Sequence, residues 1–462
     1  MKRAKIGFLP LYVKLYDDGS PNMRLRIDAF AEEIFSSLKE RDDVEVVKSE
    51  ICRLESEFAD AVSYFEEEKV DSIVTLHLAY SPSLESERIL KNTNIPIVIL
   101  DTTPNYAFTD DEDAASISYN HGIHGVQDMC NLLIRNNKKF FIEAGHYSES
   151  DVIERVVGRV KGIKAAKNFA NAKVGTIGGE FAGMGDFRVA DGVFEEIGIK
   201  SVALTSDDAK EYALRVTNEE IEALIAQDKE KYVVSDEIPE DFLYNSLRGN
   251  LAVRKWIEEK ELTAFTANFL TIRKDFGLYG MPFAEVNRAM ERGIGYAGEG
   301  DILTSALVGA FMGVSDETSF IEMFCPDWKN NLIFISHMGE MNTALTAGKA
   351  KFMIKPMKYS DIDTTWLCGT YKEGKATLID LAPLADGKFR LIVSYVEMKV
   401  PECEKFRSNS TCGWFEPSKN IATFLEDYSK LGGTHHLMLM YGDMRKTAET
   451  FAEYMGYEYY EI

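Results

Sequence analysis

The sequence has 462 residues, of which 45% are hydrophobic and 27% are charged, and its formal net charge at pH 7 is −23. This composition excludes a disordered chain, a collagen-like repeat and a small disulfide scaffold, and the length suggests about three domains. The acidic excess argues against nucleic acid and anionic membranes as partners, because both attract clustered Lys and Arg. A small-molecule ligand and a bound cation fit the chain better.

Six cysteines are dispersed along the chain without a Cys-x-x-Cys pair: Cys52, Cys130, Cys325, Cys368, Cys403 and Cys412. In a chain of this length such spacing is typical of free thiols in a reducing compartment. No apolar run approaches the roughly 18 residues that a membrane span needs. Pro10 and Lys14 interrupt the apolar N-terminus, and no small-residue cleavage site follows. We therefore expect a cytoplasmic protein without a signal peptide.

The first 170 residues alternate short apolar runs with helical patterns. Strands are predicted at 5–9, 72–77, 96–101 and 139–144, and helices at 24–40, 57–68 and 120–136. Continuous apolar runs suit strands that are buried on both faces, and strand–helix–strand alternation is typical of a parallel, doubly wound sheet. Residues 1–170 are therefore expected to form an N-terminal α/β domain of the Rossmann or flavodoxin-like kind.

The alternation starts again after a predicted helix at 149–168, with strands at 172–177, 201–204 and 263–268. The acid-rich segment between 206 and 241 is interpreted as solvated helical faces. These patterns predict a second doubly wound α/β domain over residues 171–325.

The character of the chain changes from residue 326 on. Apolar runs at 331–337, 350–354, 376–384 and 388–398 are joined by short turns, and Asp386-Gly387 is a strong hairpin signal. We expect a mainly antiparallel β-barrel domain over 326–462, closed by a helix near 443–454 and a last strand.

Two glutamates stand out as candidates for chemistry. Gly298-Glu299-Gly300-Asp301 precedes an apolar helical run, so Asp301 is predicted to be the N-cap, and Glu299 lies where the positive end of the helix favours its ionised form. The flanking glycines would let a ligand or metal approach, although a plain helix-start turn explains them equally well. Glu322 lies in an apolar stretch, where a carboxylate is rarely buried unless it is paired or bound to a metal. A surface salt bridge is the alternative for Glu322.

The histidines are few, and their placement is informative: they are His77, His121, His124, His146, His337, His435 and His436. A single histidine at a strand end, such as His337, is more often structural than a ligand. In the adjacent pair His435-His436, one ring is expected to point away from the other. No HExxH motif and no Cys/His cluster is present, so spacing alone does not identify a metal site. The glycine-rich segment 178–185 does not match G-x-G-x-x-G and is interpreted as a substrate-side loop or a turn.

In order and spacing, several of these segments resemble the L-arabinose isomerase family. They are Gly298-Glu-Gly-Asp301, Ser319-Phe-Ile-Glu322, Ser336-His-Met-Gly-Glu340 and Gly432-Gly-Thr-His-His436, together with matches around His77, His121, His146 and Phe269. The resemblance runs from about residue 70 to the C-terminus. It implies a three-domain, Mn²⁺-dependent aldose–ketose isomerase whose metal ligands fall on Glu299, Glu322, His337 and His436. Co²⁺ and Mg²⁺ are weaker candidates, and no other cofactor is implied.

The resemblance also implies a mechanism and a set of sugar contacts. L-arabinose, or a related open-chain aldose, would be converted to its ketose by enediol proton transfer between Glu299 and Glu322. Which glutamate is the base stays open, as does a hydride shift. The expected sugar contacts are Tyr80, His121, His124, Phe181, Phe269 and Phe324. Four of them, Tyr80, His121, Phe181 and Phe324, replace family residues, so the sugar is open between L-arabinose and another aldose such as L-fucose or D-arabinose.

The family further implies a homo-oligomer, a trimer or hexamer, in which subunits share an active site. Two alternative functions remain. A non-catalytic sugar-binding or sensor protein is one, because paired α/β domains also suit sugar receptors. Another metal-dependent sugar enzyme, such as an epimerase or an aldolase, is the second. Metal content distinguishes the first alternative from an isomerase, and product analysis distinguishes the second.

Overall fold

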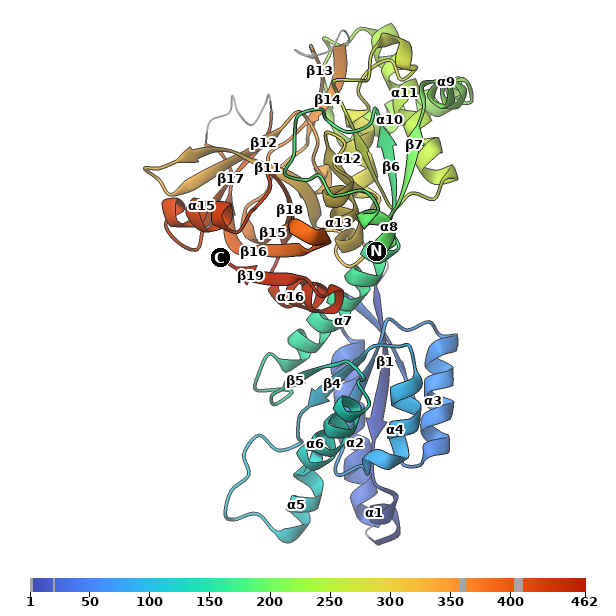
Figure 1. Cartoon of the computed structure of the whole chain (residues 1–462), viewed down its shortest axis with the longest axis vertical. Coiled ribbons are helices and arrows are strands. Elements are labelled where there is room, and N and C mark those ends of the chain that lie inside the picture. The colour runs from blue at the N-terminus through green and yellow to red at the C-terminus, as the bar shows by residue number, and fades with distance from the viewer. Residues whose placement is uncertain (1–2, 20, 357–362, 403–409) are drawn as a thin grey trace. The chain divides into compact units, whose positions relative to one another are not determined.

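The computed structural model describes residues 3–19, 21–356, 363–402 and 410–462 (Figure 1). The chain divides into two compact units, one that ends at Lys164 and one that begins at Ala165. Five of the cysteines are free, and Cys403 lies outside the described residues. Among the helices within these ranges, none is long and apolar enough to cross a membrane.

The first unit is built on a parallel sheet with the strand order β2-β1-β3-β4-β5 (Figure 1). The strands are β1 (Ala4–Leu11), β2 (Val44–Lys48), β3 (Ser72–His77), β4 (Ile97–Asp101) and β5 (Phe140–Ala144). The helices are α1 (Lys14–Gly19), α2 (Pro21–Lys39), α3 (Glu55–Glu67), α4 (Ser83–Asn92), α5 (Ala114–Asn120), α6 (Gly122–Arg135) and the part of α7 (Val152–Ala170) that ends at Lys164. One apolar core joins α2 and α7 to the sheet, and another joins α3, α4 and α6 to it. Helices therefore cover both faces, which confirms the predicted doubly wound sheet.

The second unit contains a shorter parallel sheet with the order β10-β9-β6-β7. Its strands are β6 (Lys173–Ile177), β7 (Lys200–Leu204), β9 (Ala264–Ala267) and β10 (Gly295–Gly298). Its helices are α8 (Val193–Ile197), α9 (Ser206–Leu214), α10 (Asn218–Lys231), α11 (Glu240–Glu259), α12 (Phe283–Glu291) and α13 (Ile302–Met312). The acid-rich segment forms α9 and α10, and a threonine with an acidic residue caps the start of each helix. Strand β10 was not predicted, because it is short and both of its ends are glycine.

The third sheet is mainly antiparallel, with the order β15-β18-β11-β12-β17-β16-β19. Its strands are β11 (Thr318–Asp327), β12 (Leu332–His337), β15 (Gly374–Pro383), β16 (Phe389–Lys399), β17 (Thr411–Pro417), β18 (His436–Tyr441) and β19 (Glu458–Glu461), with helices α15 (Ile421–Lys430) and α16 (Arg445–Met455). A further pairing of β15 with β16 closes the ring from β15 round to β16, while β19 joins β16 in parallel. The predicted barrel is thus confirmed, and so is the hairpin turn at Asp386-Gly387, where both residues have positive φ.

Two segments differ from the expected organisation. Glu322, which a boundary at 325 would assign to the central domain, lies on β11 of the third sheet. The strand expected at 350–354 forms as β13 (Lys351–Pro356), but it pairs with β14 (Asp363–Cys368) and β8 (Val233–Val234) instead of joining the barrel. Phe352 of β13 is fully buried in the core that also contains the central helices, so its packing holds this small sheet there. The division of the chain into three domains stays a prediction.

Candidate metal centre

Glu299 lies in the turn between β10 and α13. Its φ is 64°, in the left-handed region that non-glycine residues seldom adopt, and the following Gly300 has a φ of 85°. Asp301 caps the helix as predicted, because its carboxylate accepts a hydrogen bond from the backbone N–H of Thr304 at 2.8 Å. Glu299 is only 7% exposed. The turn therefore presents a buried carboxylate at the carboxyl end of a parallel strand, where α/β folds commonly bind ligands.

Glu322 and His436 come together through strand pairing. They are directly opposite each other in the antiparallel pair of β11 and β18, so their side chains share one face of the sheet. His337 is the last residue of β12, the other neighbour of β11. Its Nε2 lies 2.7 Å from Glu322 Oε1, while the Nε2 of His436 lies 3.1 Å from the same oxygen. Two imidazoles therefore converge on one buried carboxylate.

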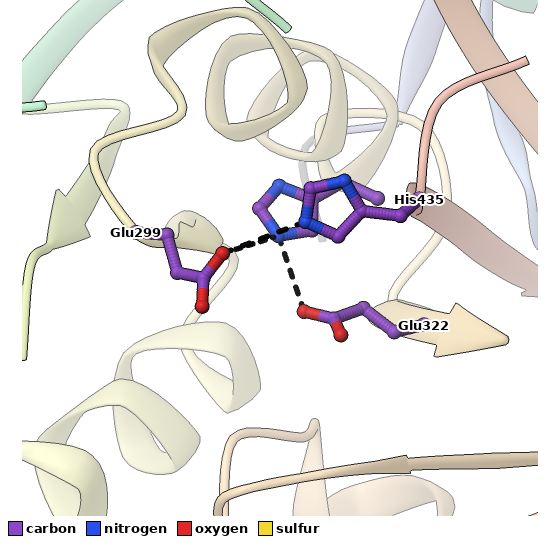
Figure 2. Close-up of side chains that lie close together, drawn as sticks. Glu299, Glu322 and His435 are labelled. Carbon is purple, nitrogen blue, oxygen red and sulfur yellow. Dashed lines mark hydrogen bonds and ion pairs between the residues drawn. The ribbon is translucent and has the colours of Figure 1, made fainter. Parts of the chain in front are cut away.

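The two glutamates and the two adjacent histidines form a compact group. Glu299, Glu322, His435 and His436 each offer one ligand atom, and these atoms all lie within 4.8 Å of one another. Figure 2 shows Glu299 approaching from one side and Glu322 and His435 from the other. The group contains three of the four ligands that the resemblance implies. The fourth, His337, contacts Glu322 without belonging to the group.

His435 was not expected in this position. The rule that neighbouring side chains point to opposite faces applies within a strand, but β18 begins only at His436, so His435 is still in the preceding turn. Its Nε2 lies 3.5 Å from Glu299 Oε2, and the rings of the two histidines are 4.1 Å apart. The prediction that one ring of the pair points away is therefore wrong.

Each of the three histidines has a carboxylate at its other ring nitrogen. Nδ1 of His436 lies 2.8 Å from Asp301, Nδ1 of His435 lies 2.6 Å from Asp186, and Nδ1 of His337 contacts Glu340. Such a partner fixes the orientation of the ring and leaves Nε2 facing the two glutamates, as in many metal sites. No sequence pattern indicated a role for Asp186, which is 249 residues from His435 along the chain.

The electrostatics of the group favour positive charge. Burial lowers the pKa of His435, but hydrogen bonds to Asp186 and Glu299 outweigh it and raise this pKa to about 9. His337 and His436 are also buried, yet their contacts with carboxylates raise both pKa values well above the usual value. Burial opposes ionisation of Glu322, but His337 and His436 bring its pKa below the usual range. The carboxylates therefore hold protons on the imidazoles, and a metal cation would compete for the same place.

The donor set suits a divalent metal ion. Carboxylate oxygens and imidazole nitrogens are ligands of Mn²⁺ and related ions. Among the side chains that the structure describes, Glu322 Oε1 and His436 Nε2 are buried and have no partner with hydrogen-bond geometry, although they face each other. Two buried ligand atoms that converge without a hydrogen bond fit a metal between them.

The aromatic residues expected near the sugar lie in different surroundings. Phe181 and Phe269 pack edge to face with ring centres 5.7 Å apart, and the backbone N–H of Phe181 donates to the carbonyl of Glu299 at 3.0 Å. Phe324 is 53% exposed and lies where the register of β11 shifts, two residues beyond Glu322. Phe187 was not predicted, but its ring stacks on His436 with centres 5.1 Å apart. Phe187 lies in the loop between β6 and α8, so this loop is close to the group of Glu299, Glu322, His435 and His436.

The first unit holds a second cluster, at the carboxyl end of its sheet. Tyr80 follows β3, and its ring centre lies 4.7 Å from that of His124 and 6.5 Å from that of His121. The hydroxyl of Tyr16 lies 3.1 Å from Nε2 of His121. His77 is buried beneath α6, where a Cβ on Gly125 would lie 2.5 Å from its ring. Tyr80, His121 and His124, the three sugar contacts expected from the N-terminal domain, thus lie together.

Comparison with known proteins gives two matches to domain families. Residues 191–317 match the L-arabinose isomerase central domain, and residues 317–458 match the L-arabinose isomerase C-terminal domain. The chain is also 27% identical over 389 residues to the L-arabinose isomerase of Halalkalibacterium halodurans, which covers 80% of this chain and 76% of that protein. It is 26% identical over 407 residues to the enzyme of Levilactobacillus brevis, covering 84% of each, and 25% identical over 488 aligned positions to that of Mannheimia succiniciproducens, covering 100% of this chain and 95% of that one.

Proposed function

The chain belongs to the L-arabinose isomerase family, and on this basis we propose that it is a metal-dependent aldose–ketose isomerase. The observation that carries the proposal is the convergence of Glu299, Glu322 and His436 in the second unit, all of them less than a tenth exposed. A sugar receptor has no need of such a buried, ligand-rich group.

The proposed metal is Mn²⁺, with Co²⁺ and Mg²⁺ as weaker candidates. Glu299, Glu322 and His436 would hold it together with His337, which is the fourth ligand in the family pattern; His435 is the competing candidate for that place. When bound, a divalent cation would polarise the sugar oxygens and stabilise the negative charge that develops during proton removal.

The two glutamates are proposed to carry out the proton transfers. In an open-chain aldose, the C2 proton is acidic because C2 is next to the C1 carbonyl. One carboxylate would take this proton and return it to C1, and the other would move the hydroxyl proton from O2 to O1. Contacts with His435 and His436 outweigh burial and lower the pKa of Glu299, and Glu322 is likewise held ionised. Both carboxylates therefore start in the form that can accept a proton.

The sugar contacts are proposed to come from the second unit of one copy and the first unit of a neighbouring copy. Tyr80, His121 and His124 would hydrogen-bond or pack against the chain of hydroxyl groups, and Phe181, Phe269 and Phe324 would line the metal side. Phe324 lacks the hydroxyl that the family pattern has at this position. Because this contact differs from the family pattern, the proposed substrate is either L-arabinose or another aldose such as L-fucose or D-arabinose.

The first unit also supports assembly into a homo-oligomer, a trimer or hexamer, with a shared active site. Large apolar side chains are exposed on the elements that surround its carboxyl-end cluster: Leu15 (70%), Leu25 (74%), Leu84 (75%), Tyr106 (72%), Phe108 (54%), Ile117 (56%) and Ile123 (49%). Such side chains would supply an interaction face if a second copy covered them. We propose that it docks on the second unit of a neighbouring copy. The free cysteines agree with a cytoplasmic enzyme.

A panel assay tests the proposal. The protein is stripped with EDTA, reloaded with Mn²⁺, Co²⁺ or Mg²⁺, and incubated with aldopentoses and 6-deoxyhexoses. We expect ketose formation that depends on the metal, with solvent deuterium entering at C1 if a proton is transferred. A metal-loaded protein that converts none of these sugars contradicts the proposed function, and epimers instead of ketoses would indicate the alternative enzyme class.

A further inference from the structure

We propose that Asp186, in the loop between β6 and α8, is a positioning residue that holds His435 and, through it, the carboxylate of Glu299. The inference rests on the proposed function, because it concerns a glutamate that is proposed to transfer protons. It assigns a role to the residue that directly follows the glycine-rich segment 178–185, which the sequence analysis interpreted as a substrate-side loop or a turn.

Asp186 fixes both the backbone and the ring of His435. Its Oδ2 accepts a hydrogen bond from the backbone N–H of His435 at 2.9 Å and lies 2.6 Å from the ring Nδ1. One carboxylate oxygen thus contacts two points of the same residue and defines the direction of the ring. The side chain of His435 is 35% exposed, and its 2.6 Å contact with Asp186 is shorter than its 3.5 Å contact with Glu299, so Asp186 is the stronger constraint on the ring.

His435 in turn faces Glu299. Nε2 of His435 lies 3.5 Å from Glu299 Oε2, and Nε2 of His436 lies 3.6 Å from the same oxygen. Glu299 Oε2 is therefore placed between two imidazoles. Asp301 orients the buried imidazole of His436, while the half-exposed imidazole of His435 depends on Asp186.

The same loop also holds the backbone of Glu299. The N–H of Phe181 donates to the carbonyl of Glu299 at 3.0 Å, and a Cβ on Gly300 would lie 2.5 Å from the carbonyl oxygen of Gly179. The start of the loop is anchored by Thr271, whose hydroxyl donates to the carbonyl of Gly178 at 2.7 Å. Because Glu299 has a disfavoured positive φ, its conformation needs such contacts to persist. Loop and Glu299 are therefore joined at the backbone and, through Asp186 and His435, at the side chain.

A positioning role differs from a stabilising one in what a substitution changes. The side chain of Asp186 is 38% exposed, and exposed ion pairs contribute little to the stability of a protein. Loss of an outer partner of a metal-site histidine commonly lowers metal affinity or activity by about 10- to 100-fold. Asp186→Ala should therefore affect turnover and metal binding while the protein remains folded.

The test compares Asp186→Ala with Asp186→Asn and with Asp191→Ala, an exposed acid five residues further along the same loop. We expect kcat of Asp186→Ala to fall about 10- to 100-fold with a small change in KM. Asp186→Asn, which keeps an oxygen acceptor, should retain part of the activity, and Asp191→Ala should equal wild type. All three variants should remain folded, as judged by circular dichroism.

Two readouts do not depend on turnover. In the metal-free protein, amide hydrogen exchange at His435 should accelerate in Asp186→Ala and not in Asp191→Ala. Mn²⁺ affinity, measured by electron paramagnetic resonance, should fall in Asp186→Ala only. Wild-type exchange, affinity and kcat in Asp186→Ala would overturn the inference and leave the proposed isomerase intact. If wild-type protein converts no aldose, the proposed function fails, while exchange and Mn²⁺ binding still decide the role of Asp186.

Discussion

Two groups of histidines, one in each unit, lie in opposite electrostatic surroundings. In the second unit, His337, His435 and His436 each have a carboxylate at Nδ1 and a glutamate near Nε2, and the pKa of His435 is raised to about 9. In the first unit, burial lowers the pKa of His77 to about 4 and also lowers that of His121, which contacts the hydroxyl of Tyr16. The histidines of the second unit can exchange protons for a cation, whereas burial favours the neutral ring in His77 and His121.

The cluster of the first unit and Glu299 of the second unit both lie at the carboxyl ends of similar parallel sheets. The first sheet has the order β2-β1-β3-β4-β5 and the second β7-β6-β9-β10, so that in each the first strand of the chain pairs with the second on one side and the third on the other. This arrangement opens a crevice at the carboxyl ends of the central strands. The difference between the two sites therefore comes from the loops and, in the second unit, from the barrel strands that add Glu322 and His436.

The largest expected effect tests the contacts between carboxylates and histidines in the second unit. Glu322→Gln keeps the shape of the side chain but removes its charge, so both the contacts to His337 and His436 and the proposed proton transfer are lost. We expect turnover to fall by about a thousandfold or more, as typical of a lost acid–base group. Mn²⁺ binding should weaken, while circular dichroism stays unchanged. Glu317→Gln, an exposed acid just before β11, is the control. An active Glu322→Gln enzyme contradicts the assignment.

The next effect tests the cluster of Tyr80, His121 and His124 in the first unit. His124→Ala should lower turnover by about a hundredfold and leave Mn²⁺ affinity unchanged, since the residue lies in the other unit. Co-expression with Glu299→Ala should restore part of the activity if subunits share sites, because mixed oligomers contain some pairs with both halves intact. Mixed oligomers that are verified by tag pull-down, yet are no more active than either parent, would show that sites are not shared.

Only part of the fold and of the candidate site could be predicted from sequence patterns. Buried parallel strands such as β3 were predictable, because both of their faces are apolar, and Asp301 was predictable because an N-cap is a local signal. The candidate metal ligands came from the resemblance, since Glu322 and His436 meet only through the pairing of β11 with β18. Asp186 and Phe187 were missed for the same reason. They lie in an irregular loop, and their contacts with His435 and His436 depend on tertiary packing.

The third prediction concerns the stability of the first unit at low pH, which depends on the lowered pKa of His77. His77 has a pKa of about 4 when folded and 6.5 as its ordinary value, so the unfolded first unit binds a proton more readily between these pH values. Its stability should therefore fall as pH drops from 6.5 to 4, by about 3 kcal/mol. Urea titrations at pH 7 and pH 4.5 on wild type and His77→Gln check this. An equal loss in both proteins would show that His77 is not responsible.

The second unit should show the reverse dependence. The raised pKa of His435 adds stability that is present below about 6.5 and lost as pH rises through about 9 in the metal-free protein. Mn²⁺ would replace these protons, so its apparent affinity should increase over the same range. At a hundred times its Kd, Mn²⁺ should stabilise this unit by about 2.7 kcal/mol and leave the first unit unchanged. Calorimetry at pH 6.5 and 8.5 measures both effects. A pH-independent affinity would contradict imidazole ligation.

The smallest expected effect concerns the choice of sugar. It is tested at Phe324, which is close in sequence to Glu322 of the candidate metal centre. Phe324 is on the shifted register of β11, two residues from Glu322, and is exposed enough to accept a hydroxyl without burying it. We expect wild type to use L-arabinose less efficiently than at least one other aldose. Phe324→Tyr should then raise kcat/KM for L-arabinose about fivefold, which corresponds to about 1 kcal/mol for one regained hydrogen bond. Phe334→Tyr, on the neighbouring strand beside Trp414, is the control. A wild-type preference for L-arabinose over every other sugar, unchanged in Phe324→Tyr, would show that the hydroxyl at this position has no part in selecting the substrate.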